Sequence, residues 1–252
     1  MKKLLMLTMT CVAFAMPSIT CAQEEEEEHG HSDVEFVYDG GKIDIEFSDE
    51  GPVFEGVFPI EGIDLQFTSE PGFASELEEG AGINAGNQIV YNIHSDLLFW
   101  NDGFKSVPND AQIRIVNRPP APLVPDTIVG VGTGEQLGSF EPALNRIGEA
   151  EADGDFHSDL DFFLEPKTDT ADASMYGFYG FIASLSTDED GVADSDPFAM
   201  VFNFGLEEEM FEEGVEAIVS TVPDPTNGIS TAVVLVFGIC FIRNRTRKLL
   251  RS

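Results

Sequence analysis

The sequence predicts a mainly β protein, an antiparallel β-sandwich or jelly roll with one amphipathic helix near its C-terminal end. Three observations favour this fold class. Short segments alternate apolar and polar residues with period two, turn residues separate these segments, and a single stretch has the 3.6-residue period of a helix. Many short strands at near-regular spacing are typical of sandwiches and jelly rolls.

The alternation is clearest in residues 43–47 and 112–115, where isoleucine or phenylalanine alternates with a charged or amide side chain. Such a strand buries one face and leaves the other in water. Aromatic and β-branched residues indicate further strands at residues 88–93, 97–100, 160–164, 176–185 and 198–204. Glycine-containing turns separate them at residues 39–41, 71–72, 101–103, 153–154 and 190–191.

The helix is expected directly after Gly205. Its apolar stripe consists of Leu206, Met210, Phe211, Val215 and Ile218. Glutamates cover the rest of its surface, and those in the first turn suit the helix dipole.

The β-rich domain is expected to span residues 31–221. Within it, the proline-rich segment 119–125 forbids a central strand. The segment is therefore either a linker that divides the domain or an edge crossing within one sandwich, and we favour one sandwich.

The chain carries 46 acidic and 13 basic residues, which gives a formal net charge of −33. Only six basic residues lie between the two ends, so the middle of the chain carries about −40. Such a surface repels nucleic acids and anionic lipid headgroups, which excludes nucleic-acid binding as a function. It attracts divalent cations and basic partners. We interpret the charge as a soluble surface suited to salty water, where screening limits self-repulsion.

The N-terminus has the three parts of a signal peptide, predicted over residues 1–22. Lys2 and Lys3 supply positive charge, residues 4–16 form an apolar run, and Thr20-Cys21-Ala22 offers small residues for cleavage. Residues 23–30 contain five consecutive glutamates and are expected to be a solvated, disordered segment. The chain is therefore predicted to be exported.

The three cysteines, Cys11, Cys21 and Cys240, all lie in the terminal segments. The domain between them has no cysteine, so no disulfide, thiol catalyst or thiolate metal site is expected in it. An ordinary hydrophobic core must hold the fold.

The C-terminus combines a Pro-acid-Pro motif, an apolar run and a basic cluster. Val222-Pro223-Asp224-Pro225 precedes residues 228–242, a predicted transmembrane anchor, and residues 243–252 form a basic tail. These fifteen apolar or small residues are short for a bilayer core of ~30 Å, and flanking arginines can extend the span by reaching the interface. The positive-inside rule places the tail in the cytoplasm.

This order of features resembles the PEP-CTERM sorting signal of Gram-negative bacteria, in which glutamate usually stands at the position of Asp224. The resemblance covers about the last thirty residues. It implies a partner, a membrane peptidase of the exosortase type, and delivery to the cell surface or the extracellular matrix. Segments 67–73 and 86–89 are similar to parts of other PEP-CTERM proteins from environmental bacteria such as planctomycetes, and that similarity implies no particular activity.

A short pattern recurs at intervals of 63 residues. His31-Ser32-Asp33 returns as His94-Ser95-Asp96 and as His157-Ser158-Asp159, each time followed by an apolar residue. The pattern would indicate a triplicated domain if it were a true repeat. We favour coincidence, because the three segments share little else.

The histidines suggest a transition-metal site as one alternative. His29, His31 and Asp33 alternate, so on a strand they share one face. Imidazole with carboxylate suits zinc or copper, and strands that begin at His94 and His157 would complete the site if they lay alongside. Solvated histidines are the simpler interpretation.

A calcium site is a second alternative. Ser186, Asp188, Asp190, Gly191 and Asp194 have the spacing of four ligands and the turn glycine of a calcium loop. Pro197 stands where that loop has a bidentate glutamate. A second carboxylate cluster consists of Asp153, Asp155, Asp159 and Asp161. Acidic surface turns are the simpler interpretation of both.

Motifs for catalysis are scarce. Residues 130–134 are glycine-rich, but no lysine follows them, and no G-x-S-x-G motif is present. A carbohydrate-binding module would expose aromatic side chains, for which the candidates are Tyr91, Trp100, Tyr176 and Tyr179. Their alternation with apolar residues favours core packing instead.

We therefore expect a non-enzymatic, membrane-anchored protein of the cell surface or matrix. A metal-binding module is the second interpretation, and a carbohydrate-binding module or an enzyme is the third. The expected partners are the sorting peptidase and the membrane, with divalent cations or surface polysaccharide as alternatives.

Overall fold

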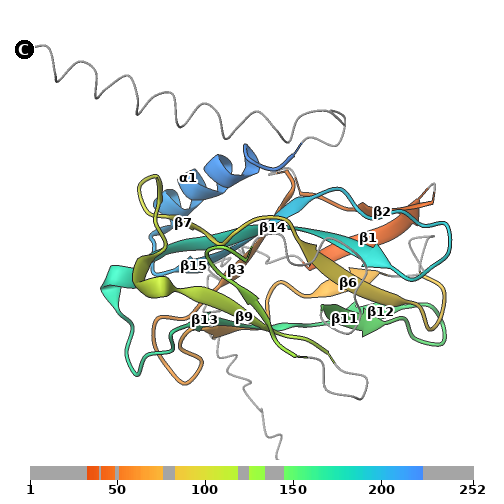
Figure 1. Cartoon of the computed structure of the whole chain (residues 1–252), viewed down its shortest axis with the longest axis horizontal. Helices are drawn as coiled ribbons and strands as arrows, with labels where there is room; N and C mark the ends of the chain where they lie inside the picture. Colours follow the sequence, from red (N-terminus) through yellow and green to blue (C-terminus); the bar gives the residue numbers. More distant parts are fainter. Residues whose placement is uncertain are drawn as a thin grey trace, which may run out of the picture. The chain divides into compact units, whose positions relative to one another are not determined.

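The computed structural model describes residues 33–39, 41–48, 51–75, 83–118, 125–133 and 145–223, and the structural statements below concern these residues. They form a mainly β fold with three sheets and one α-helix near its C-terminal end (Figure 1). The predicted fold class is confirmed at this level.

The largest sheet has seven strands and lies between the helix and the two smaller sheets. Its main path follows the order β11 (Arg146–Glu149), β6 (Gln88–Ile93), β14 (Gly177–Thr187), β15 (Phe198–Phe204) and β3 (Val53–Val57). β7 (Leu98–Trp100) continues the same edge of β14 as β6, and β8 (Phe104–Lys105) pairs with β7.

Each of the two smaller sheets has four strands. The first follows the order β12 (Phe156–Ser158), β5 (Phe73–Ser75), β1 (Val34–Asp39) and β2 (Lys42–Ile45). The second follows the order β10 (Thr127–Val129), β9 (Gln112–Val116), β13 (Asp161–Glu165) and β4 (Phe67–Thr68). Short 3₁₀ helices occur at Pro108–Asp110 and Ala173–Met175.

Not all strand pairs are antiparallel, which differs from the prediction. β1 pairs with β5 and β3 pairs with β15 in parallel register. A parallel pair needs a long connection between its strands. The alternation of residues within a strand carries no information about the direction of its partner, so the sequence could not reveal these two pairs.

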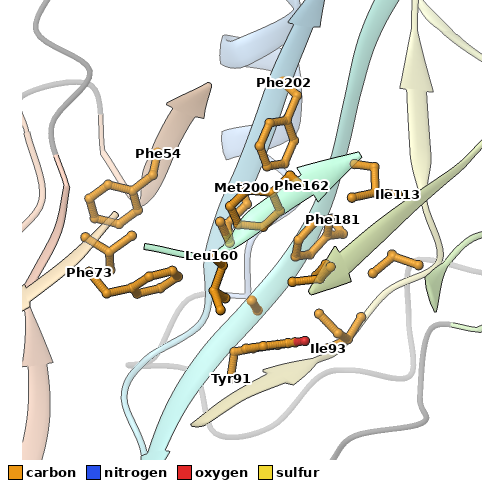
Figure 2. Close-up of a cluster of buried hydrophobic side chains, with 14 of the residues drawn as sticks. Phe54, Phe73, Tyr91, Ile93, Ile113, Leu160, Phe162, Phe181, Met200 and Phe202 are labelled. Carbon is orange, nitrogen blue, oxygen red and sulfur yellow. The ribbon is translucent and has the colours of Figure 1, made fainter. Parts of the chain in front are cut away.

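A core of aromatic and branched side chains fills the space between the large sheet and the smaller ones. Phe202 lies at its centre, with ring centroids 5.0 Å from Phe58, 4.9 Å from Phe162 and 6.3 Å from Phe181. Figure 2 shows Phe162 of a small sheet directed toward Phe202 and Phe181 of the large sheet. Facing sheets therefore bury their apolar sides against each other.

The other face of the large sheet is covered by α1 (Glu208–Val219) (Figure 1). Phe211, Val215 and Ile218 are buried there, as the stripe predicts. Met210, predicted on the same stripe, is 37% exposed, because the buried face is narrower than the apolar pattern. β14 is consequently buried on both faces along nearly its whole length.

The chain on both sides of residues 119–124 contributes to the same sheets. β6 pairs with β14 in the large sheet, and β9 pairs with β13 in a small one. The central residues of the proposed linker lie outside the described residues.

Candidate functional site

The calcium-like segment 186–196 begins inside a strand. Ser186 belongs to β14 and is 1% exposed, and its Oγ accepts a hydrogen bond from Asn92 Nδ2 at 2.5 Å. Asp188 Oδ1 accepts from the backbone N–H of Gln88 at 2.8 Å. Asp190 is exposed in the following turn, and Asp194 is exposed beyond it, next to Ala193. Ser186 thus does not belong to the turn as the spacing of ligands would require, because it is buried in β14 and its hydroxyl is bonded to Asn92 of β6.

Protein donors hold this acidic loop from two sides. Glu189 accepts hydrogen bonds from Asn87 Nδ2 at 2.7 Å and from the backbone and side-chain amides of Asn84. On the other side, Ala193 exchanges backbone hydrogen bonds with Gly41 and Ile43. The sequence analysis did not identify Glu189 as part of this contact. The only sequence signal for it was its partner, the segment 84–88, which is rich in amide side chains.

Lys42 adds an ion pair to the same loop. Its Nζ lies 2.5 Å from Asp196 Oδ1, and both side chains are about one-third exposed. An exposed pair of this kind contributes about 0–1 kcal/mol. The backbone bonds, rather than this charge pair, therefore dominate the docking of the loop.

The two histidines that the structure describes, His94 and His157, lie in different sheets. His94 follows β6 of the large sheet, and its Nε2 lies 2.8 Å from Ser184 Oγ. Desolvation of its ring lowers the pKa of His94, and the nearby Asp194 carboxylate opposes that shift. His157 belongs to β12 of a small sheet. His29 and His31 lie outside the described residues.

Asp33, His157 and Asp159 lie close together at one edge of the first small sheet. His157 Nε2 is 3.7 Å from Asp33 Oδ2 and 3.9 Å from Asp159 Oδ1. The neighbouring Gly72 donates its N–H to Asp33 Oδ1 at 3.1 Å. A Cβ at Gly72 would lie 2.7 Å and 2.8 Å from oxygens of the two carboxylates, so a glycine is needed for this approach.

This arrangement brings together residues from two of the three segments that share the recurring His-Ser-Asp pattern, namely Asp33 and His157. β5 lies between β1 and β12, and it pairs with both, so Asp33 and His157 become neighbours. The third segment with this pattern begins at His94, beside β6 and β14 of the large sheet. Within the described part of the chain, no group of three or more His, Cys, Asp or Glu side chains is arranged to hold a metal ion.

The second carboxylate cluster forms a turn and its surroundings. The backbone N–H of Asp155 donates to Asp153 Oδ1 at 3.4 Å. Asp161 lies on β13, where its carboxylate is 3.7 Å from Arg118 Nη2. These side chains are thus distributed over a turn and a strand.

The aromatic candidates for sugar binding belong to the interior. Tyr91, Trp100 and Tyr179 are at most 5% exposed, and Tyr176 packs against the core. Tyr91 Oη donates to Asn117 Oδ1 at 2.5 Å, and Tyr179 Oη donates to the Met175 carbonyl at 2.6 Å. Burial raises the pKa of both phenols. These side chains therefore have a structural role.

The predicted sorting motif begins where the described domain ends. Val222 packs against the cluster beneath α1, and Pro223 is exposed. Asp224, Pro225, the anchor at 228–242, the basic tail and the signal peptide lie outside the described residues. None of the described helices is long and apolar enough to cross a membrane.

No protein-family model, curated protein or solved structure matches this chain. The functional conclusion therefore depends on the residues and their arrangement.

Proposed function

We propose that this chain is an exported protein of the cell surface or matrix, tethered to the envelope by its C-terminal segment. The leader-like N-terminus and the order of motif, apolar run and basic tail support export and a single membrane anchor at residues 228–242. The finer description of the fold as one β-sandwich is part of this proposal. Its role is structural or binding, and no catalytic reaction is proposed.

One observation carries the proposal. α1 ends at Val219, and Val222, the first residue of the motif, still packs against the cluster beneath the helix. The packed part of the described chain thus reaches the motif itself. A sorting peptidase that cuts within residues 222–225 would leave the core intact, because the buried residues of α1 all precede this position.

Protease accessibility and mass spectrometry test this proposal. Protease added to spheroplasts should digest the domain and spare the tail after Arg243. The surface-released protein should end within residues 222–225, and Pro223→Ala should reduce release while Asp224→Glu should not. A domain that resists protease only until the membrane is permeabilised would contradict export. An intact Ser252 on all mature material would indicate an uncleaved anchor instead.

A metal-binding module is the second candidate function. His157 Nε2 lies within 4 Å of carboxylate oxygens of Asp33 and Asp159, and a bound ion would have to draw these side chains into a ligand arrangement that the described residues do not show. A ligand that binds only the native state raises stability by RT ln(1 + [L]/Kd), about 2.7 kcal/mol at one hundred times Kd. If this cluster holds zinc or copper, the ion should raise the melting temperature of the full chain above the value in sodium chloride of equal ionic strength. His157→Ala should abolish this additional increase in melting temperature. Glu46→Gln, the control, should preserve it.

Calcium binding in the acidic loop predicts a different result. Calcium chloride should raise the melting temperature more than sodium chloride of equal ionic strength, and replacing both Asp190 and Asp194 by asparagine should remove this additional increase. Equal melting temperatures in all salts would reject metal binding at both places.

A further inference from the structure

The chain that follows α1 is bonded back onto the end of the helix. An α-helix leaves the carbonyl groups of its last four residues without partners inside the helix. Residues 220–222, which we call the terminal turn, supply partners for all four of these carbonyls, those of Glu216, Ala217, Ile218 and Val219. The helix end and the first residue of the sorting motif therefore form one hydrogen-bonded unit.

Backbone N–H groups make three of these bonds. Ser220 N–H reaches the carbonyl oxygen four residues earlier at 3.4 Å. Thr221 N–H donates to the carbonyl oxygen of Ile218 at 2.8 Å. Val222 N–H donates to that of Val219 at 3.2 Å. The last two bonds reach back three residues, which is the tighter pattern of a 3₁₀ turn.

Two side-chain hydroxyls add to the same turn. Ser220 Oγ donates to the carbonyl oxygen of Ala217 at 2.7 Å. Thr221 Oγ1 donates to the carbonyl oxygen of Ile218 at 2.7 Å. Both residues are exposed. Their hydroxyls can therefore be removed without opening a cavity in the core, and such a change acts on the stability of the terminal turn.

Apolar contacts fix the terminal turn to the rest of the domain. Val219 and Val222 are half-buried and pack against the cluster beneath α1 that includes Phe211. A Cβ added at Gly51 would lie 3.5 Å from Val219 Cγ1, so the segment before β3 also contacts the helix end. The packing of the domain thus extends to Val222, which is inside the motif.

A peptidase that cuts within residues 222–225 must hold the residues on the N-terminal side of the scissile bond. A peptide that binds along an enzyme is extended, and its backbone N–H and C=O groups pair with the enzyme. The terminal turn is compact instead, because Ser220 has a helical φ of −64° and ψ of −13°. The amides of Thr221 and Val222 are already bonded within the domain. The closed turn therefore does not present the substrate conformation.

The membrane anchor restricts the same site from the other side. When the turn is closed, residues 223–227 connect the packed domain to the anchor at 228–242. These five residues span at most about 18 Å when fully extended. Opening of the turn adds residues 220–222 to this connection and lengthens it by about 10 Å. Opening therefore gives a membrane peptidase both an extended substrate and more room beside the domain.

We propose that the terminal turn is a latch that regulates sorting, so that the peptidase cuts only chains in which residues 220–222 have detached from α1. The inference rests on the proposed function, because it concerns the regulation of the same sorting site. Helix ends open locally at a much smaller free energy than global unfolding. When such opening is fast relative to cleavage, the cleavage rate follows the population of the open form. The stability of the turn, together with the motif, therefore sets the rate of release.

Two measurements on matched variants test the latch. Ser220→Ala combined with Thr221→Val removes both hydroxyls and leaves residues 222–225 unchanged. Ser220→Thr combined with Thr221→Ser keeps both hydroxyls and is the control. Hydrogen–deuterium exchange of the purified full chain in detergent measures opening at the Val222 amide. Mass spectrometry of protein released from cells, sampled over time after synthesis, measures cleavage within residues 222–225.

The hydroxyl-free variant should increase the exchange of the Val222 amide and the rate of release by the same factor. We expect about fivefold, which is ~1 kcal/mol, the usual net contribution of a hydrogen bond. The control should change neither quantity by more than about twofold. Phe211→Leu, which loosens the docking of α1 far from the motif, should also speed release and leave the same new terminus. This variant separates opening of the turn from direct recognition of residues 220 and 221 by the peptidase.

Three results would overturn the latch and leave the proposed function standing. The first is normal release of a wild-type chain whose Val222 amide exchanges as fast as in an unstructured peptide. The second is equal release of the hydroxyl-free variant and its control. The third is faster release of the hydroxyl-free variant without faster exchange, which would assign residues 220 and 221 to direct recognition. A protected Val222 amide without cleavage of the wild type or of any variant would instead reject the proposed sorting, and the latch with it.

Discussion

Replacing Gly56 by alanine is expected to lower the free energy of unfolding by about 3 kcal/mol. Gly56 lies in β3, where an added Cβ would be 2.5 Å from the backbone carbonyl oxygen of Glu70 and 2.9 Å from Phe202 Cδ1. A backbone carbonyl cannot rotate away as the end of a flexible side chain can. Phe202 cannot easily yield either, because Phe58, Phe162 and Phe181 surround its ring. The added methyl group must therefore displace the strand or its neighbour.

Thermal unfolding of the full chain measures this effect. For a domain of this size, ~3 kcal/mol corresponds to a decrease in melting temperature of roughly 6–12 °C. Gly130→Ala is the matched control, since its Cβ would make an ordinary contact of 3.5 Å with Gln112. The control should remain within about 0.5 kcal/mol of the wild type. If both variants melt together, β3 does not approach residue 70 as closely as the structure indicates.

The strands that the sequence predicts well are those with local signals. Residues 112–115 alternate clearly and correspond to β9, and the aromatic-rich residues 160–164 correspond closely to β13. The helix after Gly205 was equally visible, because its stripe repeats every three to four residues. β3 was missed, since both of its faces are largely buried and its sequence has no clean alternation.

The pairing of strands was beyond reach of the sequence. Asp33 and His157 meet only because β5 pairs with both β1 and β12, and no local pattern encodes that register. The same holds for the cross-strand neighbours Phe67, Phe163, Arg114 and Ile128, whose alignment depends on three separate registers. A partial signal existed in the adjacent Phe162 and Phe163, because consecutive strand residues face opposite sides and one aromatic ring must point outward.

The spacing of the candidate calcium ligands has less predictive value, for a different reason. Calcium-loop spacing assumes an irregular loop, whereas Ser186 is paired within β14 and Asp188 is engaged by the Gln88 backbone. A carboxylate can accept hydrogen bonds from the protein as readily as it can bind an ion. In a chain with 46 acidic residues, ligand-like spacing alone therefore has little specificity.

Phe211→Asp is expected to be the most destabilising single change in α1, by about 4 kcal/mol or more. The replacement removes a ring that is 7% exposed and lies 6.4 Å from Phe178, centroid to centroid. Loss of a buried phenylalanine alone costs about 3–5 kcal/mol. A carboxylate placed beneath the helix would also be desolvated among apolar side chains, which costs further free energy. The helix should therefore separate from the sheet.

Trp100 offers a direct measurement of that separation. It is 5% exposed and stacks on Phe178 in the same cluster, with ring centroids 6.1 Å apart. Its emission should shift to longer wavelength in Phe211→Asp, and the midpoint of urea unfolding should fall. Met210→Asp is the matched control, because Met210 is 37% exposed and an acidic residue in the first turn suits the helix dipole. Equal midpoints and equal emission for the two variants would show that α1 does not pack on the large sheet through Phe211.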